Sequence, residues 1–231
     1  MVRPAVVALL LITLAPPWAW ALTPVPLFGT QEFRANSLAA LPQWEHVLKE
    51  IGEESRVYAA CAQDSDACPD RAALAWDAHL KSLVGLDEAD QIRRVNRFIN
   101  HWRPAWADAV ACDMDGNWSP PLRFLRSEGS CADAAIAKYV SLRRLGFPAG
   151  RLRLVVVHDR LRDVRRTVLA VWTEDDVLVL DSLNDATLSQ QRISQYTPYY
   201  SVNENSRWTH APARIEQLSF SSDLPFDTGQ P

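Results

Sequence analysis

Apolar residues recur at helical spacing through the first half of the chain. The pattern predicts a short extended leader and then helices over 38–51, 69–83 and 87–102, with Ser37 as a candidate cap of the first. The stretch 103–128 is rich in Pro, Asp, Asn and Gly, which predicts a long loop with one helical turn near 122–125.

A further helix is predicted to begin at Cys131, in the stretch GSCADAAIAKY. Ser130 can accept a backbone N–H bond as N-cap, and Asp133 can complete a capping box. Gly146 and Pro148 end this helix. Its water-facing side is expected to carry Lys138, Arg143 and Arg144.

After about residue 150, the spacing of apolar residues changes from the helical pattern to the alternation typical of strands. RLRLVVVHD (151–159), TVLAVW (167–172) and DVLVLDSL (176–183) are β-branched, apolar runs with short connections, so they predict an antiparallel sheet. The aromatic tail, 195–208, is expected to add an edge strand. Helices followed by strands indicate an α+β domain.

The N-terminus has the order of a secretory signal peptide: Arg3, an apolar run, and the small-x-small site Ala19-Trp20-Ala21. We therefore expect residues 1–21 to be removed, residues 22–231 to form a single domain, and the protein to be periplasmic. The net charge of −4 and the lack of a basic arm argue against nucleic-acid binding. No later segment is long and apolar enough for an integral membrane protein.

The chain has four cysteines. Cys61 and Cys68 flank a polar, turn-rich stretch and are predicted to form a local disulfide, because a metal site would need His partners and closer spacing. Cys112 and Cys131 are either free or paired with each other.

Cys131 is placed as a nucleophile would be. The N–H groups and dipole at a helix N-terminus stabilise an anion and lower the pKa of a thiol. Asp181, which ends a strand, is the candidate orienting carboxylate. A base is expected at the start of the preceding strand.

The stretch GSCADAAIAKYVSLRRLGFP resembles the nucleophile helix of the bacterial transglutaminase-like cysteine proteinases, which include periplasmic proteases that release biofilm adhesins. LFGTQEFR, VNRFINHW, NWSPPLRFL, VLVLDSL and TPYYSVNENSRW are similar too, so the resemblance covers about residues 27–208. It implies a papain-like α+β fold and a Cys-His-Asp triad. It also implies, for the adhesin-cleaving members, calcium held by acidic residues around the cysteine.

Two departures put catalysis in doubt. The family's histidine opens a strand of the form His-x-Val-Leu, and Arg166 stands in that place here. An arginine side chain stays protonated near neutral pH and cannot relay a proton to a leaving amine. The acids on either side of the cysteine are replaced by Ser130 and Ala132, so a calcium cofactor is not expected.

Three interpretations follow. The first is a pseudoenzyme that binds a protein partner, either an adhesin or the periplasmic domain of an inner-membrane receptor. The second is an active thiol peptidase with Cys131, Asp181 and a relocated base such as His158, which lies across a hairpin from Arg166. The third is a structural periplasmic domain in which Cys131 is either a relic of the nucleophile or a disulfide partner. The sequence leaves the oligomeric state open.

Overall fold

The computed structural model describes residues 25–66, 68–102, 118–126 and 129–213. The predicted signal peptide, the C-terminal end and most of the loop before Cys131 lie outside the described residues. Within these ranges no helix is long and apolar enough to cross a bilayer.

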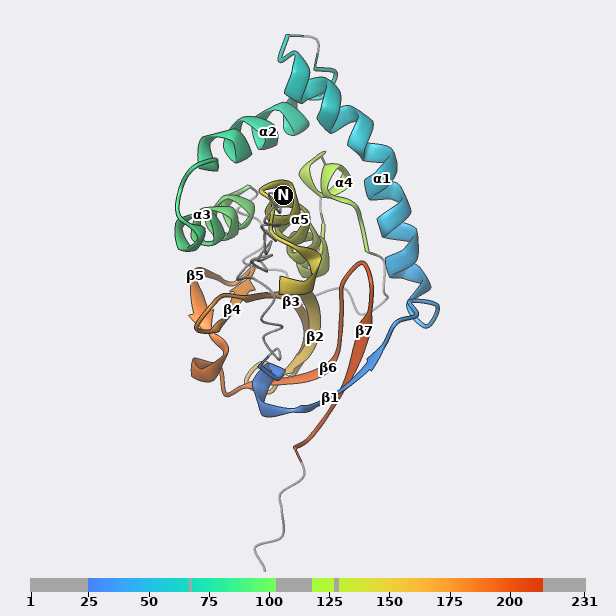
Figure 1. Ribbon diagram of the computed structural model, residues 1–231, viewed down its shortest axis with the longest axis vertical. Coiled ribbons are helices and arrows are strands. Elements are labelled where there is room, and N and C mark those ends of the chain that lie inside the picture. Colours follow the sequence, from blue (N-terminus) through green and yellow to red (C-terminus); the bar gives the residue numbers. More distant parts are fainter. Residues whose placement is uncertain (1–24, 67, 103–117, 127–128, 214–231) are drawn as a thin grey trace, which may run out of the picture.

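Five helices and one sheet make up the described fold (Figure 1). The helices are α1 (Pro42–Gln63), α2 (Arg71–Leu83), α3 (Glu88–His101), α4 (Pro121–Arg126) and α5 (Cys131–Arg144). The strands are β1 (Gln31–Ala35), β2 (Leu152–Asp159), β3 (Val164–Trp172), β4 (Val177–Asp181), β5 (Asn184–Ser189), β6 (Tyr196–Val202) and β7 (Arg207–Ala211). The α+β class and the antiparallel sheet are confirmed.

The strand order is β1-β7-β6-β2-β3-β4-β5. The aromatic tail therefore forms two strands, and β6 lies inside the sheet between β7 and β2, so the prediction of an edge strand there was wrong. The leader supplies the edge strand instead: β1 pairs with β7, about 180 residues away in the chain. The β2–β6 and β1–β7 pairings have no local sequence signature, because their partners are distant in the sequence.

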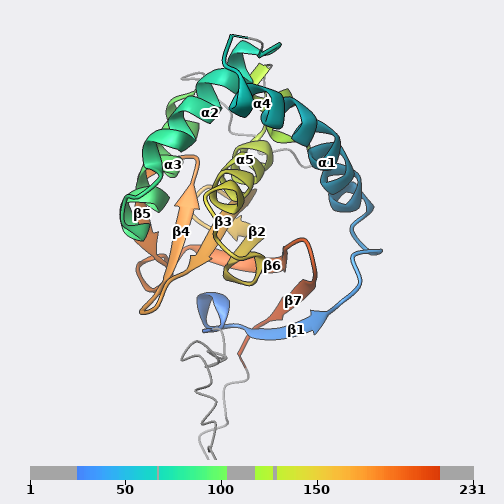
Figure 2. The ribbon, with the colours of Figure 1, turned by 45° about the horizontal axis from the view of Figure 1, so that its top comes forward.

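Helix α5 lies at the centre of the fold. Figure 2 shows α1, α2 and α3 as an arc around α5, with the sheet on its other side. Every residue of α5 from Cys131 to Leu142 is buried. A large apolar cluster fills the space between the helices and the sheet, and a smaller one lies around Val155, Val168 and Val179.

The first helix is longer than predicted and starts later. It begins at Pro42 with Leu41 as an N-cap that makes no side-chain bond, so Ser37 is not its cap. It continues to Gln63, which places Cys61 in its last turn.

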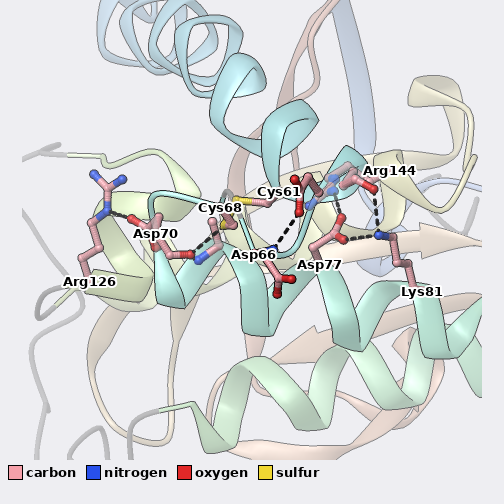
Figure 3. Close-up of a disulfide and its surroundings, with 11 residues drawn as sticks. Cys61, Asp66, Cys68, Asp70, Asp77, Lys81, Arg126 and Arg144 are labelled. Carbon is pink, nitrogen blue, oxygen red and sulfur yellow. Dashed lines mark hydrogen bonds and ion pairs between the residues drawn. A yellow bond between two sulfur atoms is a disulfide. The ribbon is translucent and has the colours of Figure 1, made fainter.

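The predicted Cys61–Cys68 disulfide is present and joins the end of α1 to the approach to α2 (Figure 3). Asp70 caps α2 by accepting the N–H of Ala73 at 2.8 Å and also pairs with Arg126 of α4. The disulfide thus ties the end of α1 to the approach to α2, and Asp70 ties the start of α2 to α4.

The leader is held to the sheet by a buried ion pair. Glu32 of β1 accepts a 2.8 Å bond from Arg153 of β2. The Arg153 guanidinium is enclosed by the rings of Trp172 and Trp208, at 4.4 and 3.6 Å from the ring centroids. Aromatic faces stabilise a desolvated cation, so this stack accounts for an arginine that is only 2% exposed.

Candidate active site

Cys131 is the first residue of α5, as predicted. The Ser130 side chain accepts the Asp133 N–H, and the Asp133 carboxylate accepts the Ser130 N–H, which completes the capping box. The Cys131 side chain is buried against β3, where the backbone N–H of Thr167 lies 3.5 Å from Sγ. The sulfur therefore lies next to the strand that was expected to supply the base.

Cys131 is disulfide-bonded. Cys61 and Cys68 pair with each other, and the remaining cysteine, Cys112, lies outside the described residues. A sulfur in a disulfide is no nucleophile until the bond is reduced, because the thiolate is the reactive species.

Arg166 and Asp181 form a buried ion pair across β3 and β4. Arg166 Nη2 lies 2.7 Å from Asp181 Oδ1 and 3.1 Å from Ser182 Oγ. The Arg166 Nε is buried and has no hydrogen-bond partner. The carboxylate that would orient an imidazole is thus occupied by a guanidinium.

Asp181 is held as an anion by its other contacts as well. Tyr196 of β6 donates its hydroxyl to Oδ2, and the Leu183 backbone N–H donates to Oδ1 at 3.0 Å. Burial alone raises the pKa of the Asp181 carboxyl, but the Arg166 charge and these hydrogen bonds outweigh burial and leave the pKa below its ordinary value.

Lys138 does not face water, contrary to the sequence prediction. It lies two helical turns beyond Cys131 and is fully buried. Burial lowers the pKa of Lys138 to about 7, although the Asp181 charge raises it in part. The prediction failed because α5 is enclosed on all sides; its run of alanines at 132, 134, 135 and 137 is the sequence feature that fits such a helix.

Arg143 and Arg144 are only partly exposed. Arg144 pairs with Asp77 of α2 at 2.6 Å and lies over the rings of Tyr58 and Trp76. Arg143 pairs with Glu204 at 2.8 Å. Both residues bind the end of α5 to its neighbours.

His158 is in register with Arg165, while Arg166 is in register with Val157. Cross-strand partners project from the same face of a sheet and consecutive residues from opposite faces. His158 and Arg166 therefore project from opposite faces. The polar contact of His158 is Asp163, at 3.4 Å.

The turn after Asp181 is fixed by two asparagines of α3. Asn100 donates to the backbone oxygen of Asp181 at 3.1 Å, and Asn96 donates to that of Asn184 at 2.8 Å. Sequence reasoning missed both, together with Tyr196. The signal available was the stretch VNRFINHW, in which two asparagines stand four residues apart and so share one helix face.

The sequence profile of the bacterial transglutaminase-like cysteine proteinases matches residues 54–214, more than half of the chain. The chain belongs to this family. No curated protein sequence matches it.

The comparison with solved structures supports the same family assignment. The chain is similar to Legionella pneumophila LapG, with a TM-score of 0.53 and 28% identity over 60% of this chain and 78% of LapG. It is also similar to calcium-bound LapG, at a TM-score of 0.53 and 25% identity over 63% and 83% of the two chains. The EGTA-treated form gives a TM-score of 0.53 and 26% identity over 64% and 83%. The transglutaminase-like fold is thus shared with a member of known structure.

The surroundings of Cys131 offer few oxygen ligands to a cation. Asp133 Oδ1 accepts the Ser119 N–H at 2.6 Å, and Oδ2 accepts the Ser130 N–H at 2.7 Å. The described residues contain no group of three His, Cys, Asp or Glu side chains placed to hold a metal ion. The carboxylate nearest the cysteine in the sequence is therefore engaged in capping the helix.

Proposed function

We propose that this chain is an exported, catalytically impaired member of the family, which acts in the periplasm by binding an adhesin-type substrate or the periplasmic domain of a membrane receptor. One observation carries the proposal: Arg166, which directly precedes the residue of β3 that contacts Cys131, pairs through its guanidinium with Asp181.

Cleavage of a peptide bond by a cysteine needs a group that accepts the thiol proton and returns it to the leaving amine. An arginine side chain keeps its proton and can act only as a counter-ion. Loss of one member of a triad reduces turnover by about 10⁴-fold or more. The disulfide bond of Cys131 also lowers catalysis, because the bonded sulfur is not a free thiolate.

LapG has a calcium-bound structure. The residues around Cys131 in this chain do not fit a calcium site, because Ser130 and Ala132 flank the cysteine and both oxygens of Asp133 accept backbone N–H bonds. Calcium prefers six to eight oxygen ligands, several of them charged. We infer that binding by this protein is independent of calcium.

The test is a binding measurement on the secreted form, residues 22–231, without reductant. The protein is immobilised and exposed to an adhesin linker segment and to the periplasmic domain of an inner-membrane receptor, each in calcium and in EGTA. We expect saturable binding to one of them, equal in both buffers, with the bound partner still intact by mass spectrometry.

The proposal would be overturned if the protein bound neither partner. If the wild type cleaved a partner into fragments and a Cys131→Ala variant did not, the proposal would be overturned in favour of a working peptidase. A tenfold loss of affinity in EGTA would refute the independence from calcium.

A further inference from the structure

A cavity of about 910 Å³ lies along the outer side of α3, with walls from α2 and β5. It is outside the Cys131 site. Its lining includes His79, Arg93, Arg94, Arg97, Phe98 and His101. Cavities of this size accommodate a ligand or a peptide segment.

The lining is cationic. Asp185 is the acid among the lining residues; it is already bonded to His101 and to Asn100, and it also feels the charge of Arg97, with which it forms no ion pair. Arg93 pairs with Asp90, but Arg94 and Arg97 form no ion pair with any described residue. In a protein with a net charge of −4, two unpaired guanidiniums in one cavity reverse the local charge.

The cavity also has an aromatic wall. The His79 ring stacks on Phe98 with 3.9 Å between ring centroids, and Trp102 lies 5.1 Å beyond. The Nε2 atom of His79 is buried and has no hydrogen-bond partner. A buried polar atom without a partner is unfavourable, and a polar ligand would satisfy it.

The spacing of the two unpaired arginines is compatible with an extended peptide. Arg94 and Arg97, the two arginines without an ion pair to a described residue, lie three residues apart on one side of α3, a rise of about 4.5 Å. Alternate side chains of an extended peptide are about 6.6 Å apart and share one face. Long, flexible arginine side chains can cover the difference in spacing, so two carboxylates on one face of such a peptide can each meet one of these guanidiniums.

We propose that this cavity binds an extended, acidic peptide segment of a protein partner. Guanidinium forks recognise carboxylates through paired N–H bonds, which gives Arg94 and Arg97 the largest roles. The inference deepens the proposed function, because it names the chemistry by which a partner is held, and it uses no residue of the Cys131 site.

The test uses fluorescein-labelled hexaglutamate as the probe and fluorescence anisotropy as the readout, with the non-reduced wild-type protein. The test variant is R94E/R97E. The matched control is R56E/R192E, which makes the same change in charge at exposed arginines on other elements. Circular dichroism checks that both variants are folded.

We expect the probe to bind the wild type and the control alike, and R94E/R97E at least tenfold more weakly. Equal binding by R94E/R97E and the wild type, or equal weakening in both variants, would overturn the proposal. So would failure of hexaglutamate to bind while ATP binds, since the site would then take a phosphate-bearing small molecule. The two proposals can fail separately. Cleavage of a partner by the wild type would refute the proposed function, but it would not change the anisotropy result that tests this cavity.

Discussion

Removing Arg166 should destabilise the protein strongly, because its partner Asp181 would remain as a buried anion. Arg166 is 2% exposed and Asp181 is 8% exposed, and their charged atoms are 2.7 Å apart. Breaking a buried pair by removing one partner costs about 3–5 kcal/mol. For Arg166→Met we expect the lower value, about 3 kcal/mol, because Lys138, Tyr196 and the Leu183 N–H still stabilise the carboxylate.

Asp181→Asn should cost more, about 5 kcal/mol, since it removes the buried carboxylate that pairs with Arg166 and leaves the Arg166 and Lys138 side chains buried together. The double variant R166M/D181N should be less destabilised than the sum of the two single changes, by about 2 kcal/mol, because residues in direct contact are coupled. The opposite result, additivity within about 0.5 kcal/mol, is the behaviour of independent sites.

The assay is urea unfolding at pH 7 without reductant, followed by far-UV circular dichroism. The control is Arg165→Met, which changes the neighbouring, exposed arginine and should shift the free energy of unfolding by less than about 1 kcal/mol. The reasoning would be refuted if R166M lay within about 1 kcal/mol of the wild type, since the pair would then not be a desolvated one.

Three further predictions concern stability. Between pH 7 and pH 10 the unfolded chain binds one more proton at Lys138 than the folded chain, so wild-type stability should gain up to about 1.4 kcal/mol per pH unit from this group as pH rises. Urea unfolding of Lys138→Met across that range should lack this gain, and an equal slope in both proteins would argue against a buried lysine. Ser130→Ala removes the cap of α5 and should lower the free energy of unfolding by about 1 kcal/mol at pH 7; no change would mean that the capping box contributes nothing. The double change C61S/C68S opens a disulfide with a sequence separation of 7 and should cost about 2 kcal/mol in the same assay, whereas an unchanged midpoint would show that the helices hold without it.

Much of the site could be predicted because its signals are local. The Ser130–Asp133 box, the start of α5 at Cys131 and the Asp181 strand each depend on residues within a few positions of one another. The Cys61–Cys68 disulfide closes a short stretch in the same way.

Long-range contacts could not be predicted from local patterns in the sequence. Lys138 was predicted to be exposed because a lysine on a helix usually is, and only the packing of three helices and a sheet around α5 buries it. The place of β6 inside the sheet and the pairing of β1 with β7 join segments that are remote in the chain. The role of Tyr196 as a donor to Asp181 follows from the same topology.

The central claim is that Arg166 stands where the family has its base, so that Cys131 cannot hydrolyse a peptide bond. The most direct test is a cleavage assay with reduced wild-type protein, an adhesin linker segment and readout by intact mass, with Cys131→Ala as the blank and an active member of the family as the positive control. The account predicts that the wild type releases no more fragment than Cys131→Ala does. Fragments formed by the wild type and absent with Cys131→Ala would contradict it.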